Sequence, residues 1–248
     1  RDENETQRTA YITFTIIALN VITWLFFQGA GQAGPLAESV CNRGLIAGEL
    51  TGTVPPGTPF KMDKKLVCYT DPGSQPLNLI TSMFLHGSWM HLLGNMWFMW
   101  IFGNNVEDSM GHARFVVFYL IGGFAAALLQ VFMTPTSVVP MVGASGAISG
   151  IMGAYVVLYP HVRVFALIPL GFFTTTVALP AWGMLGYWML LQFLGVLQSL
   201  GAEGGGVAFW AHVGGFLAGV VLIKLFARRD YVEAHQASHW RPRRVGWG

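Results

Sequence analysis

The stretch Val142–Tyr159 reads VGASGAISGIMGAYVVLY and carries no charged side chain over its 18 residues. Four of these residues are glycine and two are serine. A helix that crosses a bilayer needs about 20 mostly apolar residues, and small residues let the backbones of membrane helices approach closely. The stretch therefore predicts a membrane-spanning helix that packs tightly against a neighbour.

The composition of the whole chain agrees with this prediction. Charged residues make up 10% of the 248 residues and hydrophobic residues 53%, with a mean hydropathy of +0.51, whereas an average soluble protein has roughly 25% charged residues. These values exclude a soluble globule, a disordered chain and a disulfide scaffold. Lysine and arginine form no run interleaved with aromatic residues, which argues against nucleic acid as a partner. The expected surroundings are a lipid bilayer.

Uncharged windows elsewhere predict further spans. We expect an all-α polytopic bundle of six transmembrane helices, forming one domain over residues 1–248. The stretch 164–202 is too long for one span and is interrupted by Pro169 and Gly171, so residues 164–178 are predicted to form an interfacial hairpin. The six spans are 10–27, 85–102, 115–132, 142–159, 179–200 and 207–226.

The distribution of basic residues predicts the orientation. With the N-terminus inside, ten lysine and arginine residues lie on the inner side and four on the outer side. We therefore expect both termini in the cytoplasm, a basic cytoplasmic tail at 227–248 and an outer loop at 30–77, in a prokaryotic plasma membrane. The outer loop holds both cysteines, Cys41 and Cys68, and either a disulfide or two free thiols is consistent with the sequence.

Polar side chains within spans are costly and suggest function. His86, His91 and Asn95 lie in the second window, and His91 and Asn95 share a helix face because they are four residues apart. Ser145 and His212 lie near the N-terminal ends of the fourth and sixth windows. Even-numbered spans run in the same direction, so these groups are expected at similar depth, near the outer side.

A serine and a histidine at one depth suit nucleophilic catalysis, with a neutral imidazole taking the hydroxyl proton. No Asp or Glu occurs within any window, so the predicted arrangement is a dyad. The residues alone leave other interpretations open, both structural and functional. The glycines around Ser145 also suit helix packing, a lone histidine also suits packing or a proton relay, and three histidines suit zinc, although no HExxH motif is present.

At these residues the chain resembles the rhomboid family of intramembrane serine proteases over nearly its whole length. The resemblance rests on His86-x4-His91-x3-Asn95, on Gly143-x-Ser145-Gly146, and on Ala211-His212 followed by Gly215 and Gly219. It implies Ser145 as nucleophile and His212 as general base, with an oxyanion hole formed by the Ser145 N–H, His91 and Asn95. It also implies a supporting role for His86 and for Gly143, Gly146, Gly215 and Gly219.

The implied function is cleavage of transmembrane protein substrates without a metal or an organic cofactor, at a site opening to the outer side. Two alternatives are a non-catalytic rhomboid-like protein that binds membrane helices, and a small transporter or channel. The chain keeps both the serine and the histidine, which favours the enzyme. It departs from the family at Ser149, where an aromatic residue often stacks on the catalytic histidine. The sequence does not indicate an oligomeric state.

Overall fold

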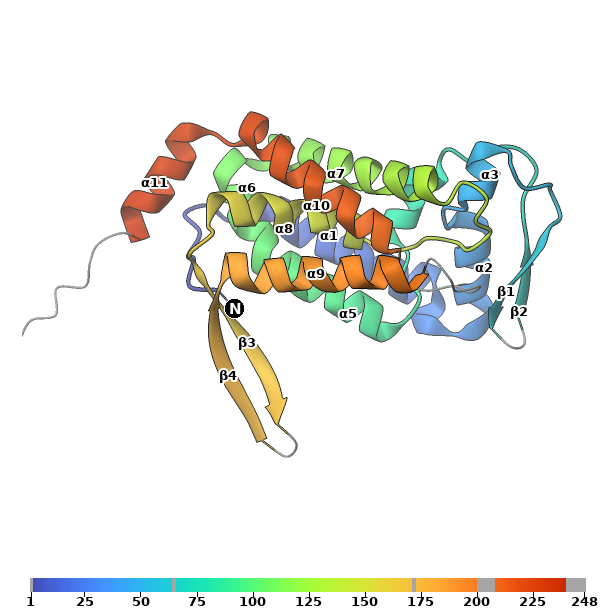
Figure 1. The fold of residues 1–248 in the computed structure, drawn as a ribbon, viewed down its shortest axis with the longest axis horizontal. Helices are drawn as coiled ribbons and strands as arrows, with labels where there is room; N and C mark the ends of the chain where they lie inside the picture. Colours follow the sequence, from blue (N-terminus) through green and yellow to red (C-terminus); the bar gives the residue numbers. More distant parts are fainter. Residues whose placement is uncertain (1, 64–65, 171–172, 200–207, 240–248) are drawn as a thin grey trace, which may run out of the picture.

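The computed structural model describes residues 2–63, 66–170, 173–199 and 208–239, and these are mostly helical (Figure 1). Short π or 3₁₀ turns flank several helices, including the π turns Thr23–Phe27 after α1 and Met99–Gly103 after α5. The helices are α1 Tyr11–Ile22, α2 Ala33–Arg43, α3 Ala47–Thr51, α4 Asn78–Thr81, α5 Trp89–Phe98, α6 Asn104–Met110, α7 His112–Met133, α8 Ser145–Leu158, α9 Ala181–Ser199, α10 Phe209–Phe226 and α11 Arg229–His239.

Helix α8 forms the centre of the bundle and packs against α7 and α10. Its residues from Ala147 to Tyr155 are all buried. A Cβ added to Gly215 would meet the backbone of Gly146, and one added to Gly219 would meet the backbone of Gly150. Helices α8 and α10 are therefore in direct backbone contact, which is the close packing that small residues permit.

Two described helices, α7 and α10, are long and apolar enough to cross a membrane. Three further apolar helices are shorter: Tyr11–Phe27, Ser145–Leu158 and Ala181–Leu197. Large apolar side chains on these elements face outward, such as Phe26, Phe132 and Leu225, and extended apolar surface suits contact with lipid. A count of six spans remains a proposal.

The expectation of an all-α chain is wrong in one respect, because two β-hairpins interrupt the helices. Strands β3 Arg163–Leu170 and β4 Phe173–Pro180 pair antiparallel, with Arg163 opposite Pro180. They occupy the segment expected to form an interfacial hairpin and project away from the bundle (Figure 1). Its Thr174–Thr176 run and Val164 and Val177 are β-branched, which favours strands over a helix.

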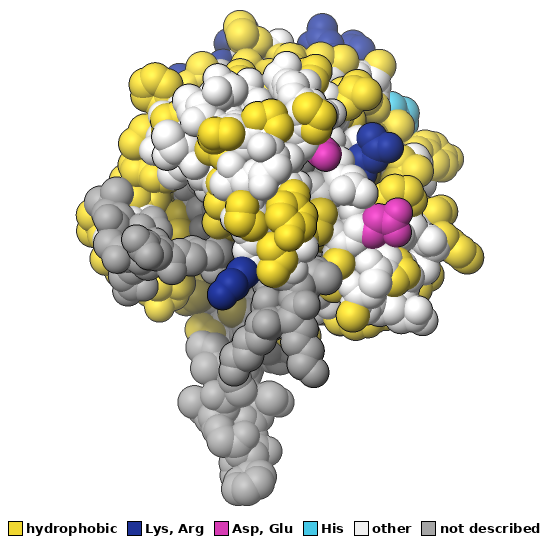
Figure 2. Space-filling model, turned by 90° about the vertical axis from the view of Figure 1, so that its right-hand side faces the viewer, with side chains coloured by type: hydrophobic (Ala, Val, Ile, Leu, Met, Phe, Trp, Pro, Cys, Tyr) yellow, Lys and Arg dark blue, Asp and Glu magenta, His cyan; other side chains and the backbone are white. Residues whose placement is uncertain are grey.

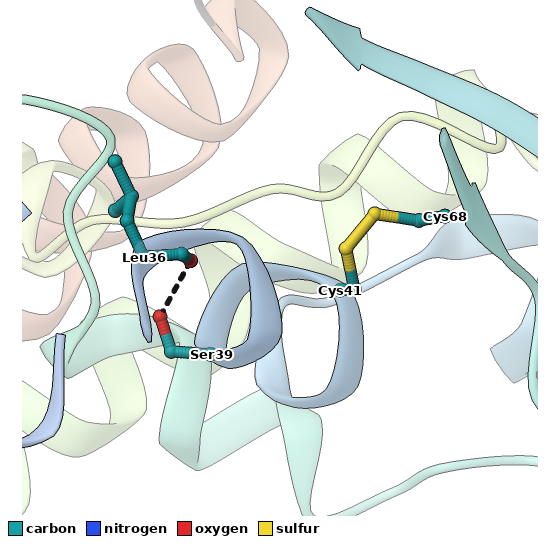
Figure 3. Close-up of a disulfide and its surroundings, with 4 residues drawn as sticks. All are labelled: Leu36, Ser39, Cys41 and Cys68. Carbon is teal, nitrogen blue, oxygen red and sulfur yellow. Dashed lines mark hydrogen bonds between the residues drawn. A yellow bond between two sulfur atoms is a disulfide. The ribbon is translucent and has the colours of Figure 1, made fainter. Parts of the chain in front are cut away.

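The segment 30–77 is also more structured than a simple loop. It contains α2, α3 and the antiparallel strands β1 Pro59–Asp63 and β2 Leu66–Tyr69. A disulfide joins Cys41 of α2 to Cys68 of β2, next to the turn in which the Ser39 hydroxyl donates to the Leu36 carbonyl (Figure 3). Seen from this end, the surface carries few charged side chains (Figure 2).

Candidate active site

Ser145 is the first residue of α8, at the end of the bundle that carries the disulfide. The segment before it pairs with the segment between α2 and α3, through mutual backbone hydrogen bonds of Leu45 and Met141. No side chain among the described residues caps α8. The first N–H groups of a helix have no partner within the helix, so the Ser145 N–H is available to a negatively charged ligand.

Gly143 shapes the approach to Ser145. Its φ of +125° is disfavoured for residues with a side chain, and its N–H donates to the Ser82 carbonyl at 2.8 Å. A Cβ at this position would lie 2.7 Å from His91 Nε2 and 3.5 Å from Asn95 Nδ2. The glycine thus allows the backbone just before Ser145 to lie against both side chains.

His212 lies in the first turn of α10 and faces Ser145. Its Nε2 is 2.8 Å from Ser145 Oγ, and its Nδ1 is 2.7 Å from Gln192 Oε1 on α9. Trp188, one turn before Gln192, places its ring centroid 5.7 Å from that of His212. Ser149 does not reach the imidazole, because its hydroxyl donates to the Ser145 carbonyl at 2.6 Å.

His91 and Asn95 project from α5, which begins one residue after its N-cap Ser88. Ser88 Oγ accepts the His91 N–H at 3.1 Å. His91 Nδ1 accepts the Gly87 N–H at 3.4 Å, so the ring proton of the neutral imidazole belongs on Nε2, which faces Gly143. Asn95 Nδ2 is buried and has no hydrogen-bond partner among the described residues. Two side-chain donors therefore lie beside the backbone that leads to Ser145.

His86 precedes α5 rather than lying within a helix, and the predicted span 85–102 stays a prediction. Its side chain is fully buried, and its ring lies edge-on to that of His91 with centroids 5.1 Å apart. Gln28 holds its backbone: Oε1 accepts the His86 N–H at 2.8 Å, and Nε2 donates to the His86 carbonyl at 2.9 Å. His86 therefore packs behind His91 without touching Ser145 in any described contact.

A small cavity of about 20 Å³ adjoins Ser145, which is room for about one water molecule. Small residues form much of its wall, including Gly123, Ala126, Gly146 and Ala211, and Met83 and Met141 also line it. The space next to the hydroxyl is therefore sized for a small group.

Three residues at this site are not among the predicted site residues: Gln192, Trp188 and Gln28. Gln192 lies in the uncharged window 179–200, and a strongly polar side chain in such a window is itself a signal. Trp188 and Gln28 give no such signal, since aromatic residues are common in membrane helices and Gln28 follows the first window. Residues 200–207, which include the end of the fifth window and the start of the sixth, lie outside the described residues.

Comparison with curated proteins finds several rhomboid relatives. The chain is 26% identical over 167 residues to Rhomboid protein 1, mitochondrial, of Saccharomyces cerevisiae, covering 64% of this chain and 44% of that protein. It is 29% identical over 160 residues to Rhomboid-like protein 11, chloroplastic, of Arabidopsis thaliana, covering 60% and 52%. It is 30% identical over 148 residues to Rhomboid-like protease 5 of Toxoplasma gondii, covering 58% and 15%. The chain thus spans about half of these relatives' length or less.

These names contradict one expectation. Several relatives are named for mitochondria or chloroplasts, which contradicts the expected prokaryotic plasma membrane. The distribution of basic residues orients a chain in a membrane but does not identify which membrane it is.

The family profile described as the Rhomboid domain matches residues 73–229, which is more than half of the chain and includes α5, α8, α9 and α10. The matched region contains Ser145, His212, His91 and Asn95. The chain belongs to the rhomboid family.

Proposed function

We propose that this protein is an intramembrane serine endopeptidase that cleaves transmembrane segments of other membrane proteins. Ser145 is the nucleophile and His212 is the general base. The observation that carries this proposal is the contact of 2.8 Å between Ser145 Oγ and His212 Nε2, since a hydroxyl is a weak nucleophile until a base within hydrogen-bond reach accepts its proton. Rhomboid membership and the name of the Toxoplasma relative support the same chemistry.

In the first step, Ser145 Oγ attacks the scissile carbonyl carbon while His212 Nε2 takes the hydroxyl proton. The tetrahedral intermediate collapses when the imidazolium returns this proton to the leaving amine, which breaks the peptide bond and leaves an acyl-enzyme. Water, deprotonated by His212, then attacks the ester and releases the second product with Ser145 restored. No Asp or Glu takes part in the described contacts of His212.

The negative charge that develops on the carbonyl oxygen needs donors already in place. The Ser145 N–H at the start of α8, His91 Nε2 and Asn95 Nδ2 supply three candidates. The missing partner of the Asn95 amide among the described residues supports this role, because buried donors without partners are rare and call for an explanation.

The cavity beside Ser145 favours substrates with a small side chain at the residue whose carbonyl is attacked. A substrate helix must also unwind locally to expose that carbonyl, and glycine in its span lowers the cost of unwinding by about 1 kcal/mol relative to alanine. The proposed substrates are therefore transmembrane segments that combine small residues with weak helix propensity.

The test uses purified protein in detergent, a fluorophosphonate probe and a reporter with one transmembrane span. The unchanged protein should react with the probe at Ser145 and cleave the reporter. The Ser145→Ala variant should do neither while keeping its thermal midpoint. Substantial cleavage by the purified Ser145→Ala variant would overturn the proposal.

A further inference from the structure

The second nitrogen of His212 has a partner on a third helix. Gln192 lies on α9, whereas Ser145 begins α8 and His212 lies in the first turn of α10. Gln192 Oε1 is 2.7 Å from His212 Nδ1. Both side chains are buried, with 8% of each residue exposed. A hydrogen bond in such a place is strong and is costly to lose, because neither group has water as a substitute.

The two ends of the Gln192 amide are distinguished by their partners. Its Nε2 donates to the Trp188 carbonyl at 3.3 Å, which turns Oε1 toward the imidazole. Since this oxygen only accepts, the proton of the neutral imidazole lies on Nδ1. Nε2 then presents its lone pair to Ser145 Oγ at 2.8 Å, which is the tautomer that a general base requires.

Trp188 and Gln192 act on the imidazole from one face of α9, because they are four residues apart. The Trp188 ring lies at 39° to the imidazole and also approaches Phe216, at 6.4 Å between centroids. Ser149, by contrast, is bonded within its own helix. In the described contacts, the side of His212 that faces away from Ser145 is therefore held by α9 and not by α8.

We propose that Gln192 is a positioning residue that fixes the tautomer and orientation of His212 through the hydrogen bond from Nδ1 to Oε1. This inference rests on the proposed function of Ser145 and His212. Gln192 takes the place that a carboxylate has in a catalytic triad. Its amide oxygen is a neutral acceptor, which avoids the cost of a buried charge in the membrane. It also makes the base dependent on α9: a displacement of this helix removes the acceptor from Nδ1.

The test compares substitutions of Gln192 with a neighbouring substitution on α9. Gln192→Met keeps the size and removes the acceptor, Gln192→Asn keeps the amide but is one methylene too short, and Gln192→Glu keeps an acceptor oxygen at the same distance. Leu191→Met is the matched control, since Leu191 is exposed on the same helix. Each variant is assayed for kcat and KM with the transmembrane reporter, for the rate of fluorophosphonate labelling, and for its thermal midpoint.

We expect Gln192→Met and Gln192→Asn to lower kcat and the labelling rate by about 10–100-fold, as for partners that orient other functional histidines, with KM unchanged. Gln192→Glu should remain within about tenfold of the unchanged protein, and Leu191→Met should match it. A role in packing alone predicts the reverse order, with Met tolerated and Glu damaging.

The positioning role would be overturned if folded Gln192→Met or Gln192→Asn kept the kcat of the unchanged protein. An equal loss of kcat in Gln192→Glu and Gln192→Met would overturn it as well. Ser145→Ala in the same assays separates this outcome from a failure of the proposed function. If Ser145→Ala is inactive while Gln192→Met is fully active, only the role of Gln192 is wrong; if Ser145→Ala cleaves, the function itself is wrong.

Discussion

Two buried histidines, His212 and His235, are each held through both ring nitrogens, and their partners differ. His212 contacts Gln192 and Ser145, which are uncharged. His235 on α11 has Nδ1 at 2.9 Å from Asp108 Oδ2 and Nε2 at 2.6 Å from Asn4 Oδ1. The first lies at the start of α10 and the second beyond its end, on the helix that extends away from the bundle (Figure 1).

Asp108 shows why the second site is an anchor. Burial opposes its ionisation, yet hydrogen bonds from His235 and from the Gln7 N–H hold the pKa of its carboxyl below the usual range. Arg8 adds an ion pair at 3.2 Å. The charge thus ties the N-terminal segment and α11 to α6. At the Ser145 end, a permanent positive charge on the imidazole would prevent it from accepting a proton. Neutral partners therefore suit a general base, whereas charged partners suit a structural contact between segments.

The largest effect that this comparison predicts comes from removing each histidine in turn. His212→Ala should lower cleavage by about 10⁴-fold or more, as when a member of a catalytic triad is lost, with the thermal midpoint nearly unchanged. His235→Ala should keep its activity per folded molecule and lose about 3 kcal/mol of stability, because it leaves a buried charge with one partner fewer. Reporter cleavage and thermal unfolding in detergent measure the two effects. Loss of kcat in a folded His235→Ala variant would contradict the division of roles.

A second prediction concerns what holds together the end of the bundle that carries Ser145, where the described residues form no ion pair with the dyad. Gly219→Ala would press a methyl group into the Gly150 backbone, and overpacking of this kind costs about 1–3 kcal/mol, or more where backbone must move. We expect a lower thermal midpoint together with slower cleavage, because α8 and α10 carry the two halves of the dyad. Gly186→Ala on α9 is the matched control, since no atom lies within 4 Å of the added Cβ; it should be neutral or stabilising by up to about 1 kcal/mol. Equal effects of the two substitutions would rule out close helix packing as the reason for Gly219.

The two regions also differ in how far the sequence predicts them. Ser145, His91, Asn95 and His212 stand out as polar residues in apolar windows, and the shared direction expected of even-numbered spans predicts that they lie at similar depth. The structural contact around Asp108 gives no such signal, because its partners Arg8 and His235 lie 100 and 127 residues away along the chain, outside every window. Only the folded chain brings these segments together.

Gln192 falls between these cases. Gln192 is a polar amide in an uncharged window, as Asn95 is, and its burial is costly as well, but it lies outside the motifs that carry the family resemblance. The contact with His212 depends on the rotation of α9 about its axis, which the weak amphipathicity of an apolar helix does not fix. The β3–β4 hairpin is similar. Its position was predictable from the length of the stretch 164–202 and from Pro169 and Gly171, which interrupt it. Its strand pairing follows from β-branched residues, which a search for uncharged windows does not take into account.

The smallest predicted effect concerns Asn95, which shares its proposed task with two other donors. Loss of a single oxyanion donor costs about 2.7–4 kcal/mol where that donor acts largely alone. Here His91 Nε2 and the Ser145 N–H remain, so we expect Asn95→Ala to lower kcat by roughly tenfold and leave KM unchanged, because the donor acts on charge present only in the transition state. Leu93→Ala on the exposed side of α5 is the control and should match the unchanged protein. A rise in KM at constant kcat would instead assign Asn95 to substrate binding. The negative charge on the substrate's carbonyl oxygen would then be stabilised by the Ser145 N–H and His91 Nε2 alone.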